Sequence, residues 1–366
     1  MNGKYIVYTE NPEEELWNTL LQYTYKSRII KFFSENKIEV NEEDKDDICE
    51  IISSSLSQAK EYYELSKEAS LNVSPLLLYY GTINLFLGAT VLKTGLKCPI
   101  DNHGMKIDFD VSDNSIGSTK IHFFNYNTGG IHVFMKKYNL AHNLVAMEDW
   151  TIKELLLSIP DINQEALQCY DYSDSFCYPI NQSINENGTV DKVVFYNKTP
   201  DQIKSIFNSI PSFSESYLEP QINQFDGYCV SVLRHKYLSK NNNIRAHYDQ
   251  EFLECGHTKN GKLILLPQWV YMYSILFGLG SLCRYVPEKW NPFLRLDESG
   301  EKLLIDKFLN VVKRVLPNIV LSLITDKEYR FENKKYQPEN KINILGEHEI
   351  KEFIQTEVLR REREKK

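Results

Sequence analysis

The sequence predicts an α+β protein that is mainly helical, with a helical core built from both ends of the chain. Two stretches carry this prediction, because residues 69–92 and 263–283 each run for more than twenty residues without a charged side chain. A helix that is apolar on all sides belongs in the centre of a larger helical domain. Between the two stretches, short alternating runs replace the helical periodicity. We therefore expect the two apolar helices to pack together and the middle of the chain to form a strand-containing lobe.

Four parts follow from this organisation. They are an N-terminal helical part (1–100), an α+β middle lobe (101–262), a C-terminal helical part (263–330) and a polar loop with a basic C-terminal helix (331–366). Of the 366 residues, 42% are hydrophobic and 25% are charged, which is typical of globular proteins and excludes disordered and low-complexity chains. The net charge of −8 argues against binding long nucleic acids through bulk charge.

Three helices are expected in the N-terminal part. The first spans 12–36, where Asn11 can cap its first turn and Pro12 suits its start. The second spans 43–70 and carries an apolar stripe at helical spacing. The third spans 75–94, and Gly95 ends it because glycine accepts a left-handed backbone.

Alternation, helical periodicity and turn-forming residues also predict the elements of the middle and C-terminal parts. Alternation predicts strands at 105–110, 119–124, 192–196, 227–233 and 262–266. Helices are expected at 150–159, 200–210, 267–285, 288–294 and 300–315, with one more helical run at 317–324. Ser, Asn, Asp and Gly dominate 170–190, which predicts a loop, and 326–346 is also expected to be a loop. The tail from residue 347 has a helical pattern.

The chain is expected to be cytoplasmic. Its first ten residues lack a basic segment followed by a long apolar run, and its seven cysteines are scattered without a CxxC pair. The two uncharged stretches are long enough to cross a bilayer. However, they contain Asn, Gln, Ser, Thr and Tyr side chains that would need partners in lipid, so we expect buried core helices and no membrane contact.

Arg284 is the first candidate for a functional residue. It ends the second uncharged stretch, within the segment Arg284-Tyr285-x-Pro287-x-x-Trp290. One interpretation is structural, since an arginine near a helix C-terminus complements the dipole and bonds the last carbonyls. The other makes Arg284 an anchor for a phosphate or carboxylate. The sequence leaves both interpretations open.

Polar side chains on the third helix and after it form the second set of candidates. Tyr80 and Asn84 lie one turn apart on an apolar helix, where they either bond within the core or bind a ligand beside Arg284. His103 follows this helix in a loop, and with Arg284 or Tyr285 beside it could transfer protons. Arg284, His103 and Tyr285 are thus the catalytic candidates, and Arg284, Tyr80 and Asn84 the ligand-binding candidates.

Familiar catalytic and cofactor motifs do not occur in the sequence. It has no GxxxxGK[ST], dinucleotide GxGxxG, GxSxG or HExxH pattern. Cys255 and His257 are closely spaced, but no second pair completes the four ligands that zinc prefers. We therefore expect no cofactor and no metal.

Two segments carry a resemblance to a known family. The run from Glu61 through Ser74-Pro-Leu-Leu-Leu-Tyr-Tyr-Gly-Thr-Ile-Asn84, followed by His103-Gly104, resembles the N-terminal half of bacterial YaaC-like proteins. The segment Arg284 to Trp290 and the amphipathic helix after it are similar to their C-terminal half. This resemblance implies an intracellular bacterial protein of about this size and no particular reaction.

The helical part also resembles HEPN-type domains, which occur in ribonuclease toxins and antiviral defence proteins. Their catalytic motif is an arginine followed five positions later by a histidine. Here Arg28, Arg234, Arg245 and Arg284 are followed at that position by Phe33, Ser239, Gln250 and Lys289. The resemblance thus implies a non-catalytic role or an altered site.

We expect a binding or assembly protein, a non-catalytic subunit or regulator in a bacterial complex of the defence type. A protein partner or a second copy of the chain is the expected partner, with nucleic acid as a further one. The alternative is an enzyme acting on RNA or nucleotides, in which Arg284 holds phosphate.

Overall fold

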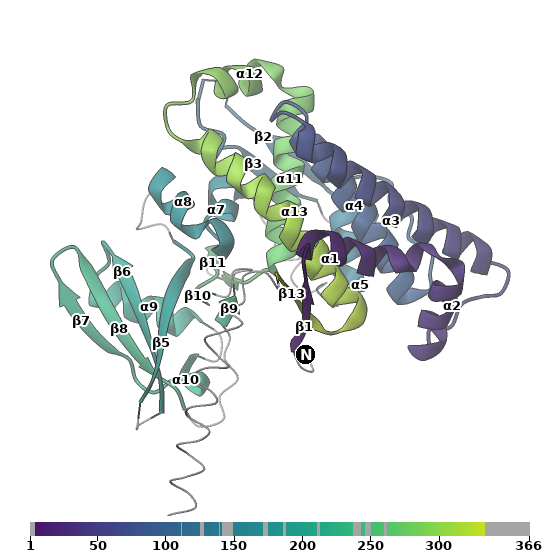
Figure 1. The fold of residues 1–366 in the computed structure, drawn as a ribbon. Coiled ribbons are helices and arrows are strands. Elements are labelled where there is room, and N and C mark those ends of the chain that lie inside the picture. The colour runs from purple at the N-terminus through teal and green to yellow at the C-terminus, as the bar shows by residue number, and fades with distance from the viewer. Residues whose placement is uncertain are drawn as a thin grey trace, which may run out of the picture.

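The structure is a computed structural model. It describes residues 4–333 except 111, 125–127, 139, 141–148, 171–174, 186–187, 211–212, 237–242, 246–249 and 260–261. The tail helix expected from residue 347 lies outside the described residues. Helices dominate the described chain, and the strands gather mainly in its middle, so the α+β, mainly α prediction is confirmed (Figure 1).

The N-terminal part begins with a strand and continues as helices. Its elements are β1 (Lys4–Thr9), α1 (Pro12–Leu21), η1 (Gln22–Thr24), α2 (Lys26–Glu35), α3 (Lys45–Glu68) and α4 (Ser74–Thr94). The single helix expected at 12–36 is wrong, because the chain breaks after η1. The Thr24 hydroxyl donates to the Leu21 carbonyl at 2.7 Å, and Tyr25 is extended at φ −92° and ψ 120° before α2 starts. The expected stop at Gly95 is confirmed, since its φ is +65°.

The C-terminal part completes the helical core. It contains α11 (Gln268–Tyr285), α12 (Pro287–Leu296), α13 (Glu301–Thr325) and β13 (Glu328–Asn333). The two runs expected at 300–315 and 317–324 form one helix, because buried residues on both sides of Pro317 keep α13 continuous despite the hydrogen bond that proline removes. The loop expected from 326 is wrong at its start, because β13 pairs in parallel with β1.

The segment between α4 and α8 packs on the helical core. It holds β2 (Met105–Asp108), β3 (Lys120–Phe123), α5 (Gly130–Lys137), β4 (Trp150–Thr151), α7 (Ile152–Leu156), η2 (Pro160–Ile162) and α8 (Asn163–Cys169). Buried residues from this segment, among them Ile121, Phe134 and Trp150, share one hydrophobic cluster with α1–α4 and α11–α13. This cluster joins the two ends of the chain, as expected for the two apolar helices.

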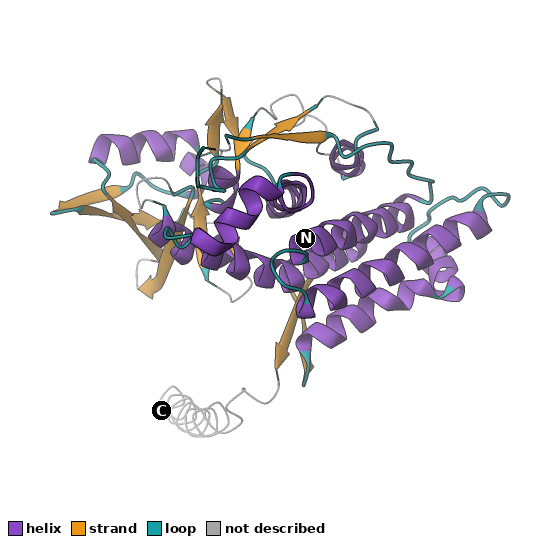
Figure 2. Cartoon of the chain, turned by 90° about the horizontal axis from the view of Figure 1, so that it is seen from above, coloured by secondary structure: helices purple, strands orange, loops and turns teal. Residues whose placement is uncertain are grey.

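A separate lobe begins after α8. A six-stranded sheet runs in the order β7-β8-β6-β5-β10-β9. Its elements are β5 (Cys177–Asn185), β6 (Gly188–Tyr196), α9 (Pro200–Ser209), α10 (Phe213–Ser216), β7 (Gln221–Phe225), β8 (Tyr228–Arg234), β9 (Asn243–Arg245) and β10 (Glu251–Glu254). The hairpin of β11 (His257–Lys259) and β12 (Lys262–Ile264) then leads back to α11. Figure 2 shows this strand-rich lobe at one side of the helical body.

The lobe has its own hydrophobic cluster, distinct from the cluster of the helical body. The loop expected at 170–190 is wrong from Cys177 onward, because β5 and the first three residues of its partner β6 lie there. Tyr178 and Ile180 of β5 are buried at alternating positions, but Pro179 between them and the polar residues 181–183 after them hide the strand pattern in the sequence.

Two helices are long and apolar enough to cross a membrane by length and composition alone. They are α4 and α13, and 67% and 56% of their most apolar windows are buried inside the protein. Such burial is typical of core helices in soluble proteins, which is consistent with the expected absence of membrane spans.

Candidate functional site

The predicted site residues meet where the first turns of α4 pass the last turns of α11. The two helices are in van der Waals contact at Gly280, since a Cβ atom there would lie 3.5 Å from the Cβ of Tyr79 and 3.7 Å from the backbone of Leu76. Tyr79 and Tyr80 belong to α4, whereas Arg284 and Tyr285 end α11. The crossing therefore brings together side chains about two hundred positions apart in the sequence.

A tight turn after α4 brings His103 next to the crossing of α4 and α11. The Asn102 side chain accepts a hydrogen bond from the Gly104 amide at 2.8 Å, and the Gly130 amide donates to the Asn102 carbonyl at 2.8 Å. Gly104 has a φ of +75°, and a Cβ there would lie 2.7 Å from the ring of His132. Glycine is therefore required at this turn, and the turn fixes the direction of His103.

Hydrogen bonds and ring contacts link these side chains. Arg284 Nη1 donates to the Tyr80 hydroxyl at 2.5 Å, and the guanidinium carbon lies 4.9 Å from the Tyr285 ring centre. The Tyr79 hydroxyl and His103 Nδ1 share a hydrogen bond of 2.8 Å. The Tyr79 and Tyr80 rings are 5.7 Å apart. We refer to Tyr79, Tyr80, His103, Arg284 and Tyr285 as the Arg284 cluster.

The side chains of the cluster differ in solvent exposure, from the buried Tyr79 to the exposed Arg284 and Tyr285. Tyr79 is buried, and burial raises the pKa of its phenol well above the ordinary value of 10.0. His103 is half-buried, and burial followed by the positive charge of Arg284 lowers its pKa below 6.5. At neutral pH the imidazole is therefore uncharged. Arg284 is exposed, and Tyr285 keeps 63% of its surface in solvent.

Four of the sequence candidates thus lie together, namely Tyr80, His103, Arg284 and Tyr285. Asn84 lies one turn further along α4, and its amide donates to the Gln58 side chain of α3 at 3.4 Å rather than to the cluster. Tyr79 is more central than the sequence suggests. Its position beside Tyr80 in the same motif was the available signal, but adjacent helix positions face different directions, so the sequence alone could not rank the two.

The comparison with protein families agrees with the two motifs that form the cluster. The sequence model of the family described as YaaC-like Protein matches residues 19–324, which is most of the chain. The chain belongs to the YaaC-like family. No curated protein and no solved structure matches it. The HEPN-like character of the helical part thus remains a prediction.

The remainder of the Arg284–Trp290 motif has a structural role in this YaaC-like protein. Lys289 and Trp290 are buried, and Lys289 Nζ donates to the carbonyls of Asp110 at 2.8 Å and Asp113 at 2.9 Å. Burial lowers the pKa of Lys289. The lysine therefore holds the loop before β3 against α12, a role that no pattern in the sequence indicates.

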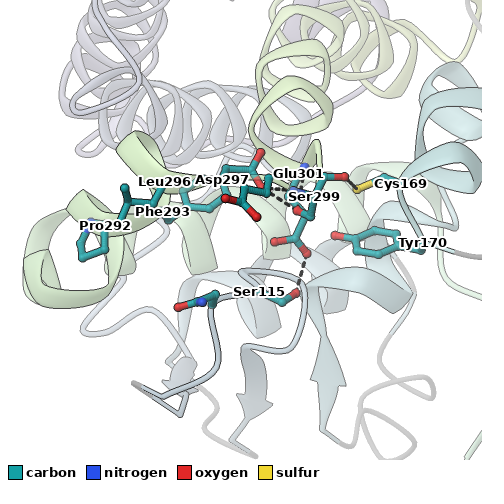
Figure 3. A pocket seen from close by; sticks show the side chains of 11 residues that line it. Ser115, Cys169, Tyr170, Pro292, Phe293, Leu296, Asp297, Ser299 and Glu301 are labelled. Atoms are coloured by element: carbon teal, nitrogen blue, oxygen red, sulfur yellow. Dashed lines mark hydrogen bonds between the residues drawn. The ribbon is translucent and has the colours of Figure 1, made fainter.

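A pocket of about 500 Å³ lies beside this loop, at the start of α13 (Figure 3). Glu301 points into the loop, where its carboxylate accepts from the amides of Ile116 and Gly117 at 2.7 and 3.0 Å and from the Ser115 hydroxyl. Asp297 also lines the pocket and accepts from the Ser299 amide and hydroxyl at 2.9 and 2.6 Å. Both carboxylates already accept hydrogen bonds from nearby residues of the protein. Their negative charge disfavours the binding of a phosphate group in this pocket.

The histidines outside the cluster that the structure describes, His122, His132, His235 and His257, have partners within the fold. The His257 ring stacks on Phe176 at 3.6 Å, and its Nε2 shares a 2.6 Å hydrogen bond with the buried Ser158 hydroxyl. His235 Nε2 bonds to the buried Asp191 carboxylate at 2.8 Å. Within the described part of the chain, no group of three or more His, Cys, Asp or Glu side chains is arranged to hold a metal ion.

Proposed function

We propose that this YaaC-like protein is a cytoplasmic bacterial binding protein, whose Arg284 cluster holds a phosphate group of RNA or of a nucleotide. In this proposal it acts as a non-catalytic subunit or regulator of a larger assembly. The observation that carries the proposal is that the exposed Arg284 guanidinium has no acidic partner among the described residues. Its contacts with described residues are the Tyr80 hydroxyl and the Tyr285 ring, and no described carboxylate pairs with it.

A guanidinium in this state is suited to an anionic oxygen. Arginine has five N–H donors in a planar fork, and the Tyr80 hydroxyl takes one of them. Phosphate accepts two parallel hydrogen bonds from such a fork, and the charge makes these bonds stronger than neutral ones. Tyr80 and Tyr285 hold the arginine from two sides, so less side-chain entropy is lost when a ligand binds.

The aromatic surroundings favour RNA or a nucleotide over a free carboxylate. Tyr285 is exposed and adjacent to the guanidinium, and an exposed aromatic ring is a stacking surface for an unpaired base. The net charge of −8 limits the site to one or a few phosphates rather than a long polyanion. A short single strand or a mononucleotide fits both conditions.

The protonation states support binding more than catalysis. Proton transfer is fastest when both the acid and the base have pKa values near the working pH. Here the pKa of Tyr79 is well above 10.0, and Nδ1 of His103 is already engaged in the hydrogen bond with the Tyr79 hydroxyl. The defence setting that we include rests only on the resemblance of the helical part to HEPN-type domains.

The enzyme alternative keeps one supporting observation. His103 is a neutral imidazole close to an arginine, which is a general base near a phosphate anchor. Under this alternative, incubation with labelled RNA yields shorter products, and His103→Ala abolishes them while leaving affinity within about threefold. Intact RNA after prolonged incubation rejects the alternative.

Fluorescence anisotropy with a labelled twelve-nucleotide oligouridine tests the proposal. Arg284→Gln is expected to weaken binding about 10- to 100-fold, the range for losing hydrogen bonds to a charged group. It should also reduce the slope of log affinity against log salt by about 0.7. Arg295→Gln is the matched control, since Arg295 is exposed on the neighbouring α12. Absence of binding by the unmodified protein, or equal losses in both variants, contradicts the proposal.

A further inference from the structure

The first strand of the protein has an unusual environment. β1 pairs in parallel with β13 over six residues, and these two strands make a sheet of their own within the described chain. A two-stranded sheet is only marginally stable by itself. Its outer edges also present backbone N–H and C=O groups that can pair with another strand. Figure 1 shows β1 beside β13 at the margin of the helical body.

The two faces of this sheet differ. In the parallel register Tyr5 lies beside Tyr329, and Val7 beside Phe331, so these four share one face. Tyr329 and Phe331 pack against the hydrophobic core, which identifies this face as the inner one. Alternation then places Ile6 and Tyr8 on the outer face, where they are 43% and 51% exposed, whereas Tyr5 at the start of the inner face is 54% exposed beside Tyr329.

After its first residue, Lys4, β1 also lacks the features that protect an edge strand. Natural edges are blocked by proline, by charged residues in the strand, or by bulges. Residues 5–9 read Tyr-Ile-Val-Tyr-Thr, with no charge, no proline and no glycine, and Tyr5, Ile6 and Tyr8 are all exposed. No other described strand pairs with β1.

We propose that β1 is the dimerisation strand of this protein and pairs antiparallel with β1 of a second copy. The result is a four-stranded sheet in the order β13-β1-β1-β13, with a twofold axis at Val7. This inference is independent of the proposed function, because β1 and β13 lie at the far end of α13 from α12 and the Arg284 cluster (Figure 1).

Symmetry and side-chain chemistry select both the partner and the register. A twofold axis perpendicular to the sheet keeps the inner faces of both copies on the same side, and it must pass through a residue position. With Val7 on the axis, Ile6 of each copy lies opposite Tyr8 of the other copy, so this pair occurs twice in the dimer. The same register sets position 4, a lysine in the sequence, opposite Glu10 of the copy.

Neighbouring registers are poorer. With Ile6 on the axis, Tyr8 lies opposite position 4, a lysine, and Glu10 loses its opposite charge. With Tyr8 on the axis, Ile6 lies opposite Glu10. Cross-strand pairs of aromatic with β-branched residues, and of opposite charges, are the favourable ones in antiparallel sheets. Only the register centred on Val7 provides both kinds.

Native mass spectrometry and sedimentation of the full chain test the oligomeric state. The expected mass is twice 42.8 kDa. The double variant Ile6→Lys/Tyr8→Lys places like charges opposite each other and should raise the dimer dissociation constant at least about tenfold. The double variant Ile6→Lys/Tyr8→Glu places opposite charges in the same positions and should restore the dimer. Leu303→Lys, at a residue 72% exposed on α13, is the control and should remain dimeric.

The register is tested separately by cross-linking. Val7→Cys should form an intermolecular disulfide on mild oxidation, because the two positions meet on the axis, whereas Tyr25→Cys, at a residue 67% exposed on the surface, should not. The seven native cysteines are buried or half-buried. A monomeric unmodified protein, an unchanged dimer in the Lys/Lys variant, or failure of the Lys/Glu variant to restore it overturns the proposal.

Discussion

The Arg284 guanidinium donates to the Tyr80 hydroxyl at 2.5 Å, although the two residues are 204 positions apart in the sequence. This bond joins the last turn of α11 to the second turn of α4, so it links the two halves of the helical core. The guanidinium donates no hydrogen bond to a described backbone carbonyl. Arg284 therefore combines a structural contact with an available charge.

The first prediction separates these two roles. Arg284→Ala should change the free energy of unfolding by less than about 1 kcal/mol, because surface substitutions seldom cost more. The same variant should lose oligouridine affinity as Arg284→Gln does. Urea unfolding followed by circular dichroism gives the stability. A loss of several kcal/mol would instead make Arg284 a brace for the end of α11.

The second prediction concerns the turn that carries His103. Gly104→Ala should destabilise the protein by about 1–3 kcal/mol, because the residue has a φ of +75° and its new Cβ would meet His132 at 2.7 Å. Gly227→Ala is the matched control, with a φ of +77° and no atom within 4 Å of the new Cβ. Its cost should be only that of the backbone, about 1 kcal/mol. Equal unfolding free energies for the two variants would refute the contact with His132.

The third prediction concerns Lys289. Lys289→Met should cost about 1–3 kcal/mol, because the loop carbonyls of Asp110 and Asp113 lose the donor that the buried lysine supplies. Lys302→Met removes an exposed lysine that donates to the Leu294 carbonyl, and it should stay within about 0.5 kcal/mol. Thermal and urea unfolding measure both. A Lys289 variant as stable as the unmodified protein would show that the loop before β3 is held by other contacts.

The fourth prediction is a pH dependence centred on His257. Burial, then the charge of Lys259, lowers its pKa to about 3 from the ordinary 6.5. Between these values the unfolded chain binds more protons at this residue than the folded protein does. The contribution of His257 to stability is therefore complete above pH 6.5, and it falls by about 1.4 kcal/mol per unit as the pH drops below that value.

A comparison with His257→Gln isolates this contribution. The stability difference between the unmodified protein and the variant, from urea unfolding at pH 7.5 and pH 5.5, should shrink at the lower pH. A difference that is constant or larger at pH 5.5 would mean that the imidazole is protonated in the folded protein.

The long apolar helices were the most predictable part of the fold. α4 and α11 lack charge almost throughout, so their burial and mutual packing follow from the sequence. Elements held by distant partners were not predictable. β13 has charged or polar residues at four of its six positions and becomes a strand because β1 pairs with it, and β5 hides its alternation among Asn, Gln and Ser residues.

The residues of the candidate site also fall into those that the sequence could identify and those that it could not. Arg284, Tyr80 and His103 could be identified because polar side chains stood out against apolar helices. The roles of Lys289 and Glu301 could not, since each depends on the path of one loop between residues 110 and 117. A lysine in an ordinary helical pattern gives no sign that it is buried. Contacts across the fold, rather than local pattern, determine what such residues do.

The most direct test of the phosphate site observes the arginine side chains themselves. In a ¹H–¹⁵N spectrum of the full-length protein, the Nε–Hε signal of Arg284, assigned with Arg284→Lys, is followed during titration with uridine monophosphate. We predict that this signal shifts in a saturable manner, while the signal of Arg295 remains in place. An unchanged Arg284 signal at saturating nucleotide and oligouridine, or equal shifts of both arginines, would contradict the assignment of the Arg284 cluster as the ligand site.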